Sequence, residues 1–476
     1  MTSRRACALF AATLACLPAG CGAEGPERAR NVILISLDTL RPDHLSCYGH
    51  ARATSPAIDA LAARGVRFAD ASSSAPWTLP AHTTMFTGLY PSHHGVKDYA
   101  HRLSAEATTL AEVLGRQGFQ TFAVINTWNI ANPSFEIFQG FAPADVHYVK
   151  ETRPTPGGGQ AIENTGAEVA ETARELVRAR AAGRPFFLFA HFYDAHTDFT
   201  PAPEYRRRFV APYAGALDGS TGQLYGLRAV GTRLGPADLR FLRELYEAEI
   251  RQLDDVLAGF LAFLDEEGLT GETLIVLTSD HGEEFQEHGG LLHGRTQHQE
   301  LLRVPLILAG PGLPRGAVVE QPVGLIDLMP TVLAHLGLPL PAALDGLDLA
   351  ATWTGAGLPE RALFGEADHN NVVDAKQVSD IKRMVRFRNE TLHFDRHTAR
   401  AQLFDLAQDP LEQRDLAASA PERVRALQER LAQFALGARA GQASGREASA
   451  SERELLRQLG YGGEDDGGKD GAGAEK

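Results

Sequence analysis

The chain has 476 residues, of which 44% are hydrophobic and 22% charged, a composition typical of a folded globular protein. A formal net charge of −14 at pH 7 argues against nucleic acid as a partner, although a local cationic pocket is still compatible with it. The length fits two or three domains, or one large α/β domain with an appendage.

The first 21 residues have the features of an export signal. Arg4 and Arg5 precede an apolar run of about 14 residues, which is too short to span a bilayer. The run ends in LPAGC, so Cys21 follows two small residues as in bacterial lipoprotein signals, although Pro18 stands where leucine is usual. We expect lipidation of Cys21, and hence an exported bacterial lipoprotein in the periplasm or on the outer surface that meets a membrane only through its lipid. Ordinary cleavage and a retained N-terminus stay open as alternatives.

Beyond a short polar linker at residues 22–30, the chain alternates strand-like and helix-like segments. Cys47 is the only cysteine left in this body, so the mature chain has no intrachain disulfide. The apolar runs of strand length are 31–37, 185–193, 273–279 and 304–310. The segments with helical spacing are 105–117, 165–182, 237–267 and 323–337. This alternation predicts an α/β fold with a parallel sheet covered by helices on both faces.

The character of the sequence changes after about residue 350. Residues 380–406 alternate short strand-like runs with turns and predict a small antiparallel sheet, and a helix is expected over 420–437. The residues from 438 are rich in Ala, Gly, Ser and charge. We therefore divide the body into a catalytic domain at 31–355, a C-terminal subdomain at 356–437 and a disordered tail at 438–476.

Three of the apolar runs end in acidic or histidine residues. Asp38 follows the first run, Asp194 and His196 lie at the end of the second, and Asp280 and His281 follow the third. Ligands of open α/β sheets bind beyond the carboxyl ends of the strands, so these side chains are expected to converge. Carboxylate oxygen and imidazole nitrogen together suit a hard or borderline divalent metal. An isolated Asp-His pair would more often be part of a solvated loop.

The second of these runs continues as HFYDAHTDF, residues 191–199. On a regular strand Asp194 and His196 share a face and could reach the same site. His191 is expected to pack in the core or behind the ligands.

The segment SSSAPWTLPAHTTMFTGLYP, residues 72–91, predicts a turn that leads into a helix over about 79–88, with Pro80 in its first turn. Thr78 then lies near the helix N-terminus, where backbone N–H groups and the helix dipole favour an anion. Its hydroxyl is either an ordinary N-cap or a metal-bound nucleophile. The spacing alone leaves both interpretations open.

Six segments in order resemble the sulfatase branch of the alkaline phosphatase superfamily, over most of residues 31–416. They are NVILISLDTLRPDHLSCYGH (31–50), TSPAIDALAARGVRFADASSSAPWTLPAHTTMFTGLYPSHHGV (54–96), TLIVLTSDHGEEFQEHGGLLHG (273–294), LLRVPLILAGPG (301–312), GLIDLMPTVLAHLGLP (324–339) and LFDLAQDPLEQRDLA (403–417). The resemblance implies a mixed, mostly parallel sheet between helix layers, followed by a small antiparallel sheet with a helix.

The resemblance also implies roles for individual residues. Asp38, Asp280 and His281 match metal ligands, and Thr78 matches the nucleophile that shares the metal. His196 matches a substrate-binding histidine. His293 stands where sulfatases often have a lysine and related phosphoryl transferases a histidine, and Asp194 is a tentative ligand of a second ion. One or two divalent ions are expected.

The sequence departs from the sulfatase pattern at the nucleophile. Sulfatases carry Cys or Ser, then Pro, then Arg at alternate positions, whereas this chain has Thr78, Pro80 and His82. Threonine cannot be converted to formylglycine, the aldehyde that sulfatases use, and His82 replaces the arginine on the substrate side. Thr39 follows Asp38 where a second acid is usual, which favours zinc or manganese over calcium, although calcium stays open.

Threonine is the nucleophile of phosphodiesterases and phosphoethanolamine transferases of this superfamily. The resemblance therefore implies a hydrolase of a phosphate diester, a phosphonate or a sulfate ester of a small molecule, glycan or lipid. Metal-bound Thr78 would form a covalent intermediate, while His196 and His293 bind the substrate oxygens or protonate the leaving group. The alternatives are a sulfatase without formylglycine, a lipid head-group transferase, which usually has N-terminal membrane spans, and a non-catalytic binding module.

Overall fold

The computed structural model describes residues 28–150, 152–154, 160–162, 164–374, 376–437 and 443–445. The predicted export signal, Cys21 and most of the linker lie outside these residues, as does nearly all of the predicted tail. None of the helices in the described ranges is long and apolar enough to cross a membrane.

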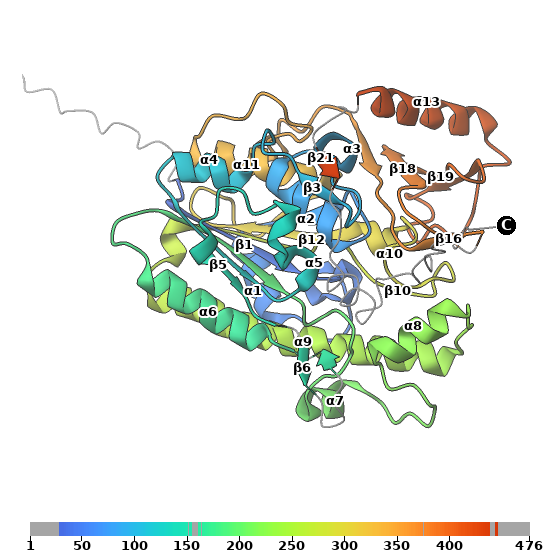
Figure 1. Ribbon diagram of the computed structural model, residues 1–476, viewed down its shortest axis with the longest axis horizontal. Helices are drawn as coiled ribbons and strands as arrows, with labels where there is room; N and C mark the ends of the chain where they lie inside the picture. The colour runs from blue at the N-terminus through green and yellow to red at the C-terminus, as the bar shows by residue number, and fades with distance from the viewer. Residues whose placement is uncertain are drawn as a thin grey trace, which may run out of the picture.

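A nine-stranded sheet forms the centre of the molecule (Figure 1). From edge to edge its strands are β13 (Ala317–Val319), β2 (Val66–Ser72), β12 (Arg303–Ala309), β9 (Thr273–Thr278), β1 (Asn31–Leu37), β8 (Phe186–Phe192), β4 (Gln120–Ile125) and β5 (Val146–Tyr148), with β14 (Val323–Gly324) paired to β2. Only β12 runs antiparallel to its neighbours, β2 and β9. The predicted mixed, mostly parallel sheet is confirmed.

Alternation along β1 assigns its side chains to two cores. Val32 and Leu34 belong to the core on one face of the sheet, and Ile33, Ile35 and Leu37 to the core on the other. A strand that is apolar at every position must be covered on both faces, because successive side chains point to opposite sides. Ser36 therefore lies on the face of Val32 and Leu34, and Asp38 directly follows the strand.

Helices cover both faces of the sheet (Figure 1). The face of Ile33 carries α1 (Pro56–Ala63), α6 (Gly166–Ala179) and α9 (Pro236–Glu266). The face of Leu34 carries α2 (Thr78–Thr87), α4 (Leu110–Arg116) and α11 (Leu328–Leu336). The predicted helices at 165–182 and 237–267 are thus present with small changes at their ends, whereas that at 105–117 begins only at Leu110. Thr109 sets this start, because its side chain and that of Glu112 form a capping box.

Shorter elements connect these layers. They are the helices α3 (Pro91–His94), α5 (Trp128–Ala131), α7 (Pro203–Phe209), α8 (Thr221–Ala229), α10 (Gln299–Leu302) and α12 (Ala350–Trp353), the 3-10 turns η1 (Pro42–His44), η2 (Ser46–Tyr48), η3 (Pro133–Phe135), η4 (Pro143–Asp145), η5 (Thr270–Glu272) and η6 (Leu325–Asp327), and the strand pairs β10 (Glu284–Phe285) with β11 (Leu291–Leu292), β6 (Thr152–Pro154) with β7 (Gln160–Ile162), and β16 (Asn371–Val373) with β17 (Lys376–Val378).

The C-terminal part forms the predicted small antiparallel sheet, with β15 (Ala362–Gly365), β18 (Lys382–Phe387), β19 (Glu390–Asp395) and β20 (Arg400–Asp405) in that order and α13 (Pro421–Gly437) packed against it. Arg386 of β18 donates to both carboxylate oxygens of Asp70 on β2, at 2.6 and 2.5 Å, and so joins the two sheets. Within the predicted tail only β21 (Ala443–Gly445) is described, and it pairs with β3 (His101–Leu103).

Candidate active site

The register of the central strands brings the predicted metal ligands together. Strand β1 lies between β8 and β9, and Ser36 is paired with Thr278 on one side and with His191 on the other. Two residues further along the parallel pair, Asp38 and Asp280 leave β1 and β9 side by side. Convergence at the carboxyl ends of the strands is therefore a direct result of parallel pairing in this register.

Asp38, Asp280 and His281 form a fully buried cluster whose ligand atoms lie within 4.8 Å of one another. His281 Nε2 is 3.2 Å from Asp280 Oδ2 and 3.7 Å from Asp38 Oδ1. Neither of these two carboxylate oxygens has a hydrogen-bond partner among the described residues. Two buried, orphaned oxygens beside an imidazole nitrogen are a donor set that fits a divalent cation.

The pKa values of Asp38 and His281 are also shifted in a way that fits a cation site. Burial and the neighbouring Asp280 carboxylate raise the pKa of Asp38 to about 7. Burial disfavours the charged form of His281, but Asp280 and Asp38 outweigh it and raise the pKa of this histidine to about 9. Both raised pKa values follow from two carboxylates buried side by side, which favour bound protons and would equally favour a cation in their place.

The backbone conformation at Thr39 helps to orient the Asp280 carboxylate in this cluster. Its φ of 57° is in the left-handed region, which is strained for a β-branched residue. The Thr39 N–H donates to Asp280 Oδ1 at 3.3 Å, and its hydroxyl donates to the Ala195 carbonyl at 3.0 Å. The His281 N–H also donates to Asp280 Oδ1, at 3.0 Å, so Oδ2 is left to face the cluster.

Thr78 faces the cluster from the other side. It is the first residue of α2, and the N-cap position is taken by Trp77, which makes no side-chain capping bond. The Thr78 hydroxyl lies 3.5 Å from His281 Nε2 and is buried. Of the two interpretations of this hydroxyl, the geometry disfavours the N-cap, because Trp77 holds that position and the hydroxyl lies beside His281.

His82 does not lie on the substrate side, where we expected it. Its Nδ1 lies 2.8 Å from the carbonyl oxygen of Thr78 and its Nε2 lies 2.8 Å from the Ser36 hydroxyl. The ring is fully buried, and burial lowers its pKa to about 4. With both nitrogens engaged inside the protein, His82 positions the first turn of α2 against β1 and leaves no nitrogen for a substrate.

His191 lies behind the ligands, one of the two places expected for it. Its Nε2 is 3.2 Å from Asp38 Oδ2, and its Nδ1 is 3.1 Å from the side-chain oxygen of Asn126. Burial lowers the pKa of His191 to about 4. Asn126 directly follows β4, the neighbour of β8, but its contribution could not be found from the sequence because it stands in no acidic or histidine motif.

His196 and His293 lie together beside the cluster, with ring centroids 4.8 Å apart, and the His293 ring lies 4.6 Å from that of His281. His196 stacks on Tyr193 at 4.1 Å, and its Nε2 lies 3.1 Å from the Tyr193 hydroxyl. His293 Nδ1 lies 3.1 Å from Glu283 Oε1. Burial and the neighbouring His293 lower the pKa of His196 to about 4, and burial together with His281 holds the pKa of His293 well below its usual value.

Asp194, expected as a tentative ligand of a second ion, lies outside this group. Its Oδ1 accepts from the backbone N–H of Gly166, the first residue of α6, at 3.0 Å. Burial raises its pKa to about 6. Because β8 ends at Phe192, the strand periodicity that would place Asp194 and His196 on one face does not extend to them.

Comparisons with known proteins agree with this geometry. A model of the sulfatase family matches residues 30–338. The multifunctional alkaline phosphatase superfamily protein PehA of Trinickia caryophylli is 25% identical over 392 residues, which cover 67% of this chain and 76% of the relative. Arylsulfatase A of Bos taurus is 27% identical over 412 residues, covering 75% of this chain and 73% of the relative.

A solved structure shows the same fold. The phosphonate monoester hydrolase of Agrobacterium radiobacter superposes with a TM-score of 0.68 at 22% identity, and the match covers 88% of this chain and 100% of that one. The family model covers well over half of the sequence, and the strand ends present a buried donor set that could hold a divalent cation. This chain therefore belongs to the sulfatase family of the alkaline phosphatase superfamily, and it is a hydrolase of sulfuric or phosphoric esters.

Proposed function

We propose that this protein is a divalent-metal-dependent hydrolase of phosphate diesters or phosphonate monoesters, with Thr78 as its nucleophile. The observation that carries the proposal is the buried Thr78 hydroxyl, which starts α2 and lies 3.5 Å from His281 Nε2 at the edge of the acidic cluster. A threonine there can attack directly as an alkoxide, whereas it cannot become formylglycine.

Asp38, Asp280 and His281 are the residues that would hold the metal, together with the Thr78 oxygen. Their donor set of two carboxylates and one imidazole favours zinc or manganese over calcium, which prefers six to eight oxygen ligands. When bound, such an ion would supply a lowered pKa for the Thr78 hydroxyl and would neutralise charge on the substrate.

The proposed reaction consists of two successive displacements at phosphorus. Thr78 Oγ1, after losing its proton, attacks phosphorus in line with the leaving group; the ester P–O bond breaks, and the departing alkoxide takes up a proton. In the second displacement water attacks phosphorus, the bond to Thr78 Oγ1 breaks, and the threonine hydroxyl regains a proton.

The two histidines beside Asp38 serve the substrate. His196 is oriented by the stacked ring of Tyr193, and His293 by the carboxylate of Glu283. His293, whose Nδ1 is engaged by Glu283, would use Nε2 to bind a non-bridging oxygen or to pass the proton to the leaving group. The Nδ1 of His196 is held by the Thr197 carbonyl at 2.8 Å, so His196 would contact the substrate through Nε2 in exchange for the Tyr193 hydroxyl. His82 holds Thr78 in place through its hydrogen bond to the Thr78 carbonyl oxygen.

Sulfate-ester hydrolysis without formylglycine is the second candidate function. It is favoured by the match to the sulfatase family model and by the 27% identity with arylsulfatase A. Both functions would use the same metal ligands, so the residue at position 78 and the choice of substrate must distinguish them.

The test compares wild type, Thr78→Ala and Thr78→Ser on bis-nitrophenyl phosphate, a phenylphosphonate monoester and nitrophenyl sulfate, in buffers with defined zinc or manganese. We expect wild type to turn over the phosphorus esters faster than the sulfate. Thr78→Ala should lose at least about 10³-fold in kcat on the phosphorus esters, since the nucleophile is removed. Thr78→Ser should retain more activity than Thr78→Ala because it keeps a hydroxyl.

Two results would overturn the proposal. Sulfate turnover that exceeds phosphorus-ester turnover and survives Thr78→Ala would support the second candidate. Phosphorus-ester turnover that is unchanged in Thr78→Ala would exclude Thr78 as the nucleophile. Mass spectrometry of protein quenched during turnover should show a phosphoryl or phosphonyl group on the peptide of wild type that contains Thr78, and none on that of Thr78→Ala.

A further inference from the structure

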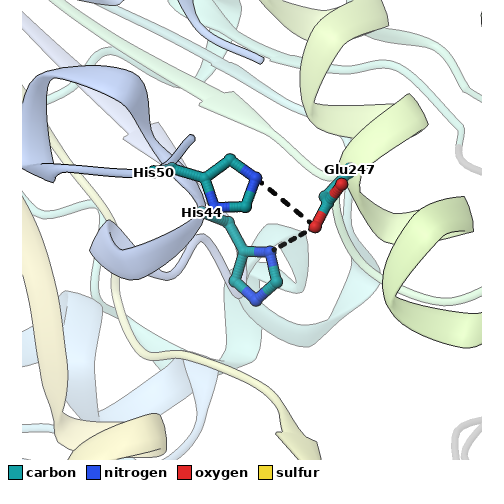
Figure 2. Close-up of side chains that lie close together, drawn as sticks. All are labelled: His44, His50 and Glu247. Carbon is teal, nitrogen blue, oxygen red and sulfur yellow. Dashed lines mark ion pairs between the residues drawn. The ribbon is translucent and has the colours of Figure 1, made fainter. Parts of the chain in front are cut away.

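We propose that His44, His50 and Glu247 form a second metal site, which binds a zinc-class divalent cation separately from the Asp38 cluster. His44 is the last residue of η1, His50 follows η2, and Glu247 projects from the middle of the long helix α9. Figure 2 shows the two imidazole rings turned toward the same carboxylate. The inference does not depend on the reaction proposed above.

The distances match a tetrahedral metal site. His44 Nδ1 and His50 Nε2 each lie 3.4 Å from the same atom, Glu247 Oε1 (Figure 2). Zinc binds imidazole nitrogen and carboxylate oxygen at about 2.0–2.2 Å, so two of its tetrahedral ligands are about 3.3–3.5 Å apart. The spacing is thus long for a hydrogen bond and right for two ligands of one ion.

The two nitrogens are also without other partners. Both are buried, and neither makes a hydrogen bond of ordinary geometry with any residue that the structure describes. Buried imidazole nitrogens normally find a partner, because desolvation without a hydrogen bond is costly. An imidazole nitrogen that carries no proton is the form that binds a metal.

Arg52 orients the Glu247 carboxylate. Its guanidinium donates to Glu247 Oε2 at 2.5 Å and to the Phe209 carbonyl at 2.6 Å, and it lies over the Phe209 ring at 4.7 Å. One oxygen of Glu247 is thus held by a fixed cation, while the other is left for the imidazoles. A ligand that is oriented by such a neighbour is typical of metal sites.

One of the two imidazole rings is partly exposed. The side chain of His50 is 17% exposed, against 7% for His44 and 8% for Glu247. Solvent therefore lies nearest to the site on the side of His50. Three protein ligands leave the fourth position of a tetrahedral ion to water.

A second group of two histidines and a glutamate provides the contrast. His298 Nδ1 lies 2.9 Å from Glu412 Oε2, and His393 Nε2 lies 2.8 Å from Glu412 Oε1. Each histidine there has its own carboxylate oxygen at hydrogen-bond distance, so the group is complete without an ion. The group around Glu247 is not complete in this way, since two nitrogens share one oxygen at a longer distance.

A metal ion at this site would have a structural role. The neighbouring residue on α9, Tyr246, accepts from the Arg41 N–H and donates to the Thr39 carbonyl, both at 2.8 Å. The His44 ring packs edge-on against Tyr246 with centroids 5.0 Å apart. A cation at this point would therefore fasten to α9 the segment that directly follows Asp38.

The test counts metal ions in chelator-treated protein that is reloaded with Zn²⁺ and freed of excess ion by gel filtration. We expect about two equivalents per chain in wild type, and one equivalent less in His50→Gln and in His44→Gln. His397→Gln, which changes an exposed histidine, is the matched control and should keep the wild-type count. Asp280→Asn should lose the other equivalent, because it alters the Asp38 cluster.

A spectroscopic readout isolates the new site. In an Asp280→Asn background, Co²⁺ should give the visible absorption of a tetrahedral site, and Zn²⁺ should raise the midpoint of thermal unfolding. Both effects should vanish when His50→Gln is added. The proposal is overturned if His50→Gln and His44→Gln, with unfolding midpoints near wild type in chelator, bind as many zinc equivalents as wild type, or if the Co²⁺ spectrum survives His50→Gln.

Discussion

Replacing His191 by phenylalanine should weaken metal binding at the Asp38 cluster without removing any ligand. His191 Nε2 lies 3.2 Å from Asp38 Oδ2, and both side chains are fully buried. Because Asp38 Oδ1 already lacks a hydrogen-bond partner among the described residues, His191→Phe leaves neither carboxylate oxygen with a side-chain hydrogen-bond partner. The phenyl ring fills most of the space, so the loss of the hydrogen bond is the main effect.

The expected magnitude follows from the strength of that hydrogen bond. A hydrogen bond to a charged acceptor contributes about 1.5–3 kcal/mol, and each 1.4 kcal/mol is about tenfold in affinity. Partners that orient metal ligands typically change metal affinity by about 10–100-fold. We therefore expect the half-saturating metal concentration of His191→Phe to rise about 10–100-fold.

The assay measures phosphodiesterase activity against free zinc or manganese in a metal buffer, which reports only on the ion that the reaction needs. His191→Gln, which retains a donor, should recover part of the affinity, and His397→Gln should match wild type. A His191→Phe variant that folds normally and has the wild-type half-saturating metal concentration would refute this reasoning.

Three further outcomes test the stability of the fold. His82→Ala should lower the free energy of unfolding by about 2–4 kcal/mol in urea titrations, because it removes two buried hydrogen bonds and leaves a cavity; a loss under about 1 kcal/mol would contradict this. Although burial opposes it, the hydrogen bond to Glu300 raises the pKa of His288 to about 9, so the stability that His288 contributes is complete below about pH 6.5 and is lost as the pH rises to 9. The difference in unfolding free energy between wild type and His288→Gln should therefore shrink over that range, and a constant difference would exclude the ion pair. Asp70→Asn should cost about 1–3 kcal/mol, because it leaves the buried Arg386 guanidinium without its carboxylate, and an unchanged unfolding midpoint would show that this pair does not join the two sheets.

The strands at the centre of the fold could be predicted closely. The apolar runs at 31–37 and 273–279 correspond to β1 and β9, because a buried parallel strand is apolar at every position and is bounded by polar residues. The strands at 66–72 and 120–125 could not be predicted in this way, since neither is a continuous apolar run. The antiparallel direction of β12 could not be predicted either, because alternation along a strand is the same in both directions.

The sequence by itself determined which residues stand at the ends of the strands, and a parallel sheet must gather such residues at one edge. That is why Asp38, Asp280 and His281 could be expected to meet, and why the presence of Thr78 in place of cysteine or serine could be interpreted from the sequence alone. Tertiary structure decided the directions of His82 and Asp194, which depend on where α2 and α6 begin. It also decided the meeting of His44 with Glu247, which are 203 residues apart in the chain. No local pattern encodes such a contact, because it follows from packing a helix against a turn that only the complete sheet brings within reach.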